Sequence, residues 1–337
     1  MTNHTKLINH SEKKIKVAVI GAGYLGRFHA QKYACSPHAE LTAIIDIDRK
    51  RANDIAQELF IEGLSEQKVP VGENIKDFID QTEAVSIVVP TQAHYSVAKA
   101  CLNYGLHCLI EKPLTTTAEQ ADHLINAAQA KKLKLQVGHL ERFNPAFRQL
   151  KQELKGYNKP LFIEAHRLSG FQPRATDVNV IFDLMIHDID LILNLVNSDV
   201  IHIEADGIGV ITDNIDIANA RIRFASGSFA SLTSSRVSRE SKRRIHLFAD
   251  KRYYAVDCKK QYLESSRVIK EPVSEQRTIE SQSFNIVQSD NLQAEIEHFL
   301  TAVKTNQEPL VTGAQGKKAL MMATEITEKI LQNGTKL

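Results

Sequence analysis

Residues 14–34, KIKVAVIGAGYLGRFHAQKYA, carry the strongest structural signal in this chain. The first seven residues are mostly apolar and β-branched, which is typical of a buried strand. Glycines follow at positions 21, 23 and 26, and the remainder has the composition of a helix. A strand that enters a helix through a glycine-rich turn is the first unit of a parallel α/β sheet.

The same alternation continues through the N-terminal part of the chain. Further strands are predicted over 41–48, 84–90, 107–113 and 134–139, and further helices over 49–60, 95–105 and 115–133. Strands separated by single helices indicate a parallel sheet with right-handed crossovers. We therefore predict a doubly wound Rossmann domain over 14–137, preceded by a flexible polar lead-in over 1–13.

The pattern changes in residues 138–337. A helix over 181–196 is followed by long β-type segments, and two helices end the chain. The β-type segments cover 200–212, 216–235, 243–257 and 261–269, and the final helices 291–305 and 314–333. Apolar residues alternate on either side of Ser226-Gly227, which predicts a hairpin. This part is predicted to be an α+β domain with an open, mostly antiparallel sheet.

Composition argues against several classes of partner. The 337 residues include 42 basic and 40 acidic side chains, a net charge of +2, so we expect no nucleic-acid partner. No apolar run is long enough to span a bilayer and no secretory signal is visible, so we expect no membrane partner. The basic run SRVSRESKRR (235–244) is interpreted as a strand edge protected from aggregation. Four scattered cysteines indicate reduced thiols and a cytoplasmic protein.

The glycine-rich turn predicts a dinucleotide site. Gly21 permits the tight turn, Gly23 lets the backbone approach a pyrophosphate, and Gly26 lets helix and strand pack closely. Asp46 lies 20 residues after Gly26, at the end of the next predicted strand. Its carboxylate can accept hydrogen bonds from a ribose and would repel a 2′-phosphate, which favours NAD. NADP stays an alternative because Arg49 and Arg51 are near.

Two segments further along the chain carry candidate chemistry. In HCLIEKPL (107–114), Lys112 follows the end of a parallel strand, where ligands of such sheets bind. Pro113 can be cis or trans. DLMIHDIDLIL (183–193) has helical spacing, and Asp183, His187 and Asp190 fall on one face of an otherwise apolar helix. This polar face either forms an internal network, with His187 as a structural brace, or lines a cleft.

Taken together, the glycine loop, PTQAH (90–94), EKP (111–113) and D-x-x-x-H (183–187) resemble the glucose–fructose oxidoreductase / inositol dehydrogenase family (Gfo/Idh/MocA). The resemblance covers nearly the whole chain. It implies an NAD-dependent sugar oxidoreductase and a homo-oligomer, dimer or tetramer, built through the C-terminal sheet. It also implies a set of cofactor contacts: Gly21, Gly23, Tyr24, Leu25, Gly26, Asp46, Pro90, Thr91, His94, Glu111 and Lys112.

The resemblance assigns catalysis to Lys112, Asp183 and His187. Oxidation of an alcohol removes a proton from oxygen and a hydride from carbon. A histidine can accept the proton near neutral pH, and Asp183 would fix its tautomer. Lys112 would stabilise developing alkoxide charge. No metal is expected. Bulky Val180, Ile181, Phe182 and Met185 stand where many members carry glycines, which leaves the shape of the substrate pocket open.

Longer stretches such as VGHLERFNPAF (137–147) and the Tyr24 form of the glycine loop resemble a narrower branch, the UDP-N-acetylglucosamine 3-dehydrogenases of lipid A biosynthesis. A nucleotide-sugar substrate would bind guanidinium groups well. Its candidate contacts are Arg142, Asn144, Arg167, Arg174 and Asp190. The alternatives are a dehydrogenase of another sugar or of a cyclitol such as inositol, and a non-catalytic NAD-sensing protein.

Overall fold

The structure is a computed structural model that describes residues 13–172, 178–270 and 277–333. The predicted substrate contact Arg174 and residues 1–12 of the predicted lead-in lie outside the described residues. The chain divides into two compact units. Unit 1 comprises Met1–Ile110, Ala127–Leu135 and Ile296–Pro309, and unit 2 comprises Glu111–Asn126, Gln136–Glu295 and Leu310–Leu337.

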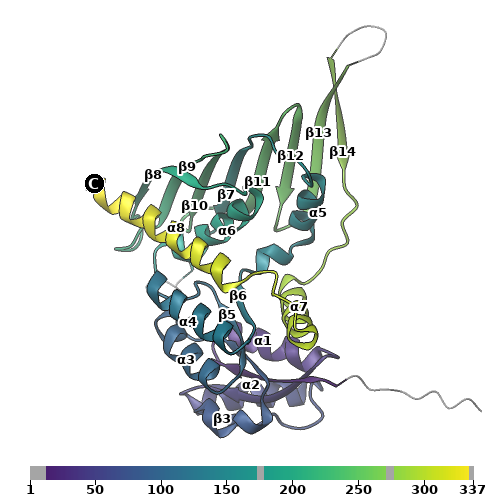
Figure 1. The fold of residues 1–337 in the computed structure, drawn as a ribbon, viewed down its shortest axis with the longest axis vertical. Helices are drawn as coiled ribbons and strands as arrows, with labels where there is room; N and C mark the ends of the chain where they lie inside the picture. The colour runs from purple at the N-terminus through teal and green to yellow at the C-terminus, as the bar shows by residue number, and fades with distance from the viewer. Residues whose placement is uncertain (1–12, 173–177, 271–276, 334–337) are drawn as a thin grey trace, which may run out of the picture. The chain divides into compact units, whose positions relative to one another are not determined.

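The first sheet is a six-stranded parallel sheet in the order β3-β2-β1-β4-β5-β6, with helices on both faces (Figure 1). The strands are β1 (Ile15–Ile20), β2 (Ala39–Ile45), β3 (Val71–Gly72), β4 (Ala84–Ile87), β5 (His107–Glu111) and β6 (Leu135–Gly138). The helices are α1 (Tyr24–Cys35), α2 (Arg49–Ile61), α3 (Thr91–Asn103) and α4 (Ala118–Ala130). This order confirms the predicted doubly wound Rossmann sheet and reverses direction between β1 and β4.

Local residues explain where these helices begin. Asp48 caps α2, because its carboxylate accepts the backbone N–H groups of Lys50 and Arg51. Helix α3 begins at Thr91, four residues before the predicted Tyr95, directly after Pro90. The start of α3 therefore follows β4, and β4 pairs with β1, the strand that leads into the glycine turn.

The second sheet has eight strands in the order β14-β13-β12-β11-β7-β10-β9-β8. They are β7 (Phe162–Leu168), β8 (Val200–Ile208), β9 (Ile217–Phe224), β10 (Phe229–Ser235), β11 (Lys242–Ala249), β12 (Arg252–Asp257), β13 (Tyr262–Lys270) and β14 (Arg277–Ser283). The pair of β7 and β10 is parallel, and every other neighbouring pair of this sheet is antiparallel. The predicted mostly antiparallel sheet and the Ser226-Gly227 turn are confirmed, with Gly227 at φ +83°.

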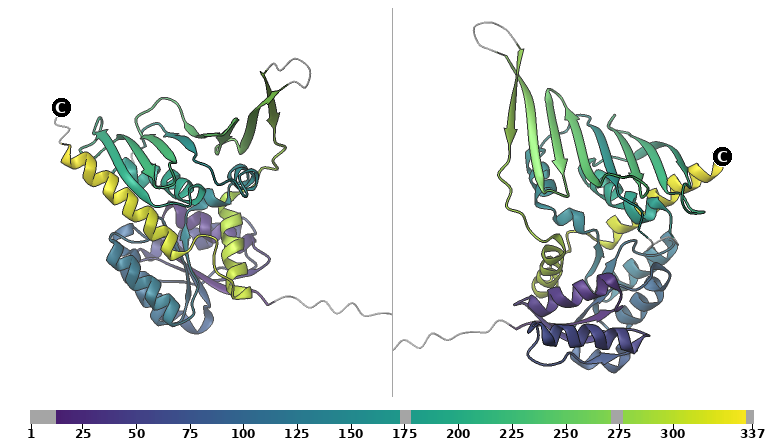
Figure 2. Two further views of the ribbon diagram at one scale, coloured as in Figure 1. Left: turned by 45° about the horizontal axis from the view of Figure 1, so that its top comes forward. Right: turned by 180° about the vertical axis from the view of Figure 1, so that it is seen from behind.

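Helices cover one face of this second sheet (Figure 2). They are α5 (Pro145–Glu153), α6 (Ile186–Leu195) and α8 (Gly313–Gln332). Helix α7 (Asn291–Thr305) precedes α8 in the chain. No helix of the described chain lies on the other face, so the sheet is open as predicted. None of the helices in the described ranges has the length and apolar content needed to cross a bilayer.

The prediction that the basic run at 235–244 forms a strand edge is wrong. Residues from Lys242 onward form β11, which lies between β12 and β7 in the interior of the sheet. Within the same run, Arg236 is buried, and its Nε lies 2.7 Å from Asp216 Oδ1. This basic segment therefore contributes to the sheet and its core.

Candidate active site

The glycine turn in unit 1 has the geometry of a phosphate-binding loop. Gly21 adopts φ +107°, and a Cβ there would lie 2.5 Å from the carbonyl oxygen of Val88. A Cβ on Gly26 would lie 1.8 Å from the Gly21 carbonyl oxygen, so both positions require glycine. Gly23, in contrast, has open space around its missing Cβ and precedes α1. A pyrophosphate could approach this backbone and the helix N-terminus together.

Asp46 lies directly after β2 and is tied to the glycine turn. Its Oδ2 accepts the backbone N–H of Ala22 at 2.6 Å, and its Oδ1 accepts that of Asp48 at 2.8 Å. Arg51, the candidate NADP contact, forms an exposed ion pair with Asp48. The arrangement fits NAD, because a carboxylate stands where a 2′-phosphate would have to be accommodated.

The remaining predicted cofactor contacts of unit 1 lie on the first turns of two helices. Tyr24 and Leu25 begin α1 with exposed side chains. Pro90 precedes α3, Thr91 begins it, and His94 is buried with Nε2 2.9 Å from the carbonyl oxygen of Val89. Their contact with the cofactor stays a prediction.

In unit 2, the helix that carries Asp183 and His187 begins with a π-helical turn, Ile181–Met185, and continues as α6. Three of the bulky residues that stand where the resemblance leads us to expect glycines, Val180, Ile181 and Met185, are fully buried in the core. A π-helical turn is uncommon and is found frequently at functional sites. Here it lies at the start of the helix, where Asp183 stands.

The ammonium group of Lys112 meets this π-helical turn. Lys112 Nζ donates to the backbone carbonyl of Asp183 at 2.7 Å and lies 3.9 Å from the Asp183 carboxylate. Burial lowers the pKa of Lys112, and the charges of Asp183 and Glu111 oppose this effect. The Lys112–Pro113 peptide bond is cis. The structure thus brings together two of the three predicted catalytic side chains.

His187 is the third, and it is partly buried. Its Nδ1 is buried and has no hydrogen-bond partner among the described residues, and Asp183 therefore does not fix its tautomer directly. Burial, followed by the positive charge of Lys112, lowers the pKa of His187 well below its usual value of 6.5. A neutral imidazole at neutral pH can accept a proton, as a general base must.

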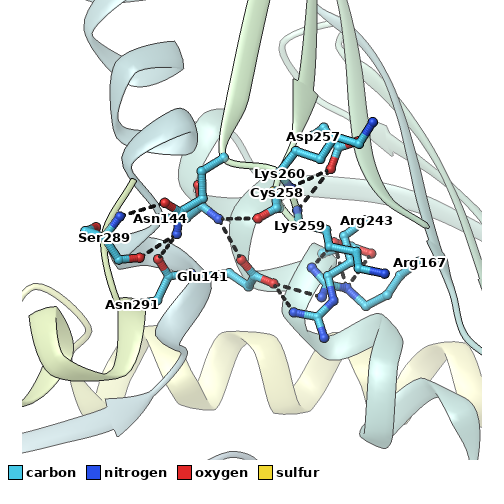
Figure 3. Close-up of polar contacts among 12 residues, drawn as sticks. Glu141, Asn144, Arg167, Arg243, Asp257, Cys258, Lys259, Lys260, Ser289 and Asn291 are labelled. Atoms are coloured by element: carbon cyan, nitrogen blue, oxygen red, sulfur yellow. Dashed lines mark hydrogen bonds and ion pairs between the residues drawn. The ribbon is translucent and has the colours of Figure 1, made fainter. Parts of the chain in front are cut away.

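Two predicted substrate contacts, Arg167 and Asn144, are engaged within the protein (Figure 3). Arg167 is buried, donates to both carboxylate oxygens of Asp188, and donates to Glu141 at 3.0 Å. Asn144 donates to Glu141 at 3.2 Å and to the Cys258 carbonyl at 2.8 Å, and its Oδ1 accepts the N–H of Ala146 at the start of α5. Their contact with substrate stays a prediction, and these bonds favour a positioning role.

The other two described candidates, Arg142 and Asp190, face each other. Both are 3% exposed, and Arg142 Nε lies 3.6 Å from Asp190 Oδ2. That distance is too long for a hydrogen bond, and Asp190 Oδ2 has no hydrogen-bond partner among the described residues. Burial lowers the pKa of Arg142, and Asp190 opposes this effect.

Sequence reasoning overlooked two residues near His187. His139 follows β6, and its ring centroid lies 6.5 Å from that of His187. Arg243, at the start of β11, is half exposed, pairs with Glu141 at 3.5 Å, and lowers the pKa of His187 (Figure 3). The available signal was a polar residue at the end of a strand: His139 follows a parallel strand at the edge where ligands bind.

Comparison with known proteins agrees with this geometry. Residues 15–139 match the model of the oxidoreductase family with an NAD-binding Rossmann fold (GFO_IDH_MocA), and residues 158–255 match the GFO/IDH/MocA C-terminal domain. The chain belongs to the Gfo/Idh/MocA family. As a member of this family, it is an NAD-dependent oxidoreductase of the group that contains sugar and cyclitol dehydrogenases.

Two members of the Gfo/Idh/MocA family show how far the similarity extends. UDP-N-acetylglucosamine 3-dehydrogenase from Acidithiobacillus ferrooxidans is 37% identical over 93% of this chain and 96% of its own. A solved structure of that protein has a TM-score of 0.88 and 35% identity over 96% of this chain and 100% of its own. Myo-inositol 2-dehydrogenase from Thermotoga maritima is 26% identical over 91% of this chain and 94% of its own.

Proposed function

We propose that this protein uses NAD⁺ to oxidise the C3 hydroxyl of UDP-N-acetylglucosamine to a ketone, which would provide the 3-keto intermediate for a 3-amino sugar of lipid A. The observation that carries the proposal is the 37% identity over nearly the full length to a UDP-N-acetylglucosamine 3-dehydrogenase. The fit of Lys112 and His187 to alcohol oxidation supports it from the chemistry of the site.

Each catalytic side chain has a distinct task in this proposal. His187 is neutral at neutral pH, because burial and Lys112 lower its pKa, and it removes the proton of the substrate hydroxyl. The Lys112 ammonium donates to the same oxygen and stabilises the negative charge that develops there. The Asp183 carboxylate, 3.9 Å from Lys112 Nζ, favours the charged form of Lys112, and the Asp183 backbone carbonyl accepts a hydrogen bond from Nζ. NAD⁺, when bound, accepts the hydride.

The diphosphate of a nucleotide sugar needs cationic partners with accessible donors. Arg167 is buried and paired with Asp188 and Glu141, and Arg142 is buried beside Asp190. Arg243 is different, because about half of its side chain is exposed, and among the described residues its ion pair is the long contact to Glu141. We assign the diphosphate to Arg243, whose charge also reaches His187.

Inositol is the second candidate substrate, because inositol dehydrogenases also match most of this chain. A cyclitol carries no diphosphate, so it would offer no anionic group for Arg243 to bind. We therefore favour the nucleotide sugar.

A homo-oligomer is also part of the proposal. The open face of the second sheet carries a row of stacked rings, with Phe162 5.3 Å from Phe229 and 5.4 Å from Phe248, and both Phe162 and Phe248 are 37% exposed. Exposed aromatic rows of this kind mark protein interfaces. Light scattering would distinguish a dimer or tetramer from a monomer.

The proposal is tested by NADH formation with UDP-N-acetylglucosamine, other UDP-sugars and myo-inositol. Lys112→Ala should lower kcat with UDP-N-acetylglucosamine by about 100- to 1000-fold, because a donor to the developing charge is lost. NAD binding should remain. Lys159→Ala is the control, since Lys159 forms an exposed ion pair with Asp250 and should not change the rate. Undiminished turnover by Lys112→Ala, or preference for myo-inositol, would contradict the proposal.

A further inference from the structure

The His139 side chain is buried without a hydrogen bond to any described protein group. It is 1% exposed, and neither of its ring nitrogens has a hydrogen-bond partner among the described residues. A neutral imidazole always offers one N–H donor and one acceptor, and leaving both unpaired in the interior is costly. Such groups in folded proteins usually contact an ordered water.

His187 is the residue best placed to share a bridging water with His139. The two rings are nearly perpendicular, at 87°, with centroids 6.5 Å apart. A direct hydrogen bond between two imidazoles needs centroids within about 5 Å, whereas one bridging water permits a separation of about 6 to 7 Å. The buried Nδ1 of His187 also has no partner in the described part of the chain. One water can therefore satisfy a nitrogen of each ring.

Two buried carboxyl groups belong to the same surroundings: the charge of Asp190 acts on both His139 and Glu295. Asp190 Oδ2 and both carboxyl oxygens of Glu295 are buried without hydrogen-bond partners among the described residues. Burial, then the charges of Glu111 and Asp190, raises the pKa of Glu295 well above its usual range, which favours the neutral form of Glu295. The groups that act on His139 are Asp190 and Glu111, which favour its protonation, and Lys112 and Arg142, which oppose it.

We propose that His139 is a positioning residue, which fixes the tautomer of His187 through a bridging water and links it to the Asp190 carboxylate. The His187 Nδ1–H donates to the water, and the water donates to a nitrogen of His139. The other nitrogen of His139 carries its proton on the side of Asp190. The Nε2 lone pair of His187 is then left for the substrate hydroxyl, and Asp190 stabilises the imidazolium that forms.

This inference rests on the proposed role of His187 as the base, so its first test requires no substrate. Nitrogen NMR of histidine-labelled protein reports which ring nitrogen carries the proton, and the His187→Gln variant assigns the signal. We expect His187 to be protonated at Nδ1 in the wild type, and to become a mixture of tautomers in His139→Leu. An Nε2–H tautomer in the wild type, or no change in His139→Leu, would overturn the inference even if the substrate assignment is correct.

Kinetics supply the second test. His139→Leu should lower kcat by about 10- to 100-fold with little change in KM for NAD, as is typical when a residue that orients a catalytic group is lost. The acid limb of the pH profile should move to lower pH, because the imidazolium loses its link to Asp190. His139→Gln keeps a donor and an acceptor and should recover most of the rate. Equal losses in His139→Leu and His139→Gln, with an unmoved acid limb, would show only structural damage and refute the proposal.

Discussion

Asp188 and Asp190 lie two residues apart on α6, and each is 3% exposed, yet their surroundings are opposite. Asp188 receives three hydrogen bonds from Arg167, the shortest at 2.8 Å. Asp190 Oδ2 receives none, and the described residues offer it only Arg142 at 3.6 Å. The carboxylate of Asp188 is therefore fully engaged in an ion-pair network, while Asp190 Oδ2 has no hydrogen-bond partner among the described residues. Equal burial therefore conceals two different hydrogen-bond environments.

The largest effect on stability is expected for Asp188→Asn. This substitution removes the charge that compensates buried Arg167 and should lower the free energy of unfolding by about 3 kcal/mol. Urea denaturation monitored by circular dichroism measures it. If the variant is as stable as the wild type, Asp188 is not the structural member of the pair.

An intermediate effect is expected when the pH is lowered. Burial holds the pKa of His187 in the folded protein well below its usual 6.5, so below that pH the unfolded chain binds a proton that the folded protein does not. Stability is therefore lost as the pH falls below 6.5, by up to about 1.4 kcal/mol per pH unit from this residue. Glu295 opposes this trend, because its raised pKa favours proton binding by the folded state.

The contribution of His187 is isolated by comparing the wild type with His187→Asn. We expect the variant to lose less stability between pH 6.5 and pH 5, as measured by denaturant unfolding at each pH. Parallel pH dependences for the two proteins would mean that His187 is not held neutral.

The smallest effect is expected for Asp190→Asn, the same substitution on the other side of the helix. The described residues make no hydrogen bond to Oδ2, and the ion pair with Arg142 is longer than that between Asp188 and Arg167, so the cost should be about 1 kcal/mol. The same urea titration provides the comparison with Asp188→Asn. A cost as large as that of Asp188→Asn would remove the distinction between the two sides of α6.

The Rossmann unit could be predicted in detail because its signals are local. The glycines at 21, 23 and 26, the apolar strands and the helical spacing all follow from neighbouring residues, and the structure reproduces each strand within a few positions. The predicted start of α3 at Tyr95 is four residues late: the prediction assigns Pro90 to the preceding strand, whereas the first turn of the helix begins directly after Pro90.

The second sheet was harder to predict for a physical reason. In β7, FIEAHRL, residues at alternate positions point inward, but one of them is Arg167, and a buried arginine hides the apolar alternation. Strand β14 is almost entirely exposed at the sheet edge and is defined by pairing with β13. Helix α5 had a usable signal in the Asn144 cap and Pro145 at its first position.

The candidate site shows the same limit. Lys112, Asp183 and His187 could be proposed from motifs, but the contacts of these residues depend on residues far away in sequence. Asp183 was expected to hold His187 and instead meets Lys112, while His139 lies beside His187 across 48 positions of sequence. Such pairings are set by the tertiary fold, which no local pattern encodes.

The attachment of Asp46 to the turn that follows β1 constrains any redesign of coenzyme preference. The Asp46 carboxylate accepts hydrogen bonds from the backbone amides of Ala22 and Asp48. A substitution meant to admit an additional phosphate therefore also removes the hydrogen bond between the glycine turn and the end of β2. An engineered switch must therefore restore that anchor as well as introduce a cation. Asp46→Ser, which keeps an acceptor at this position, is a better starting point than Asp46→Ala.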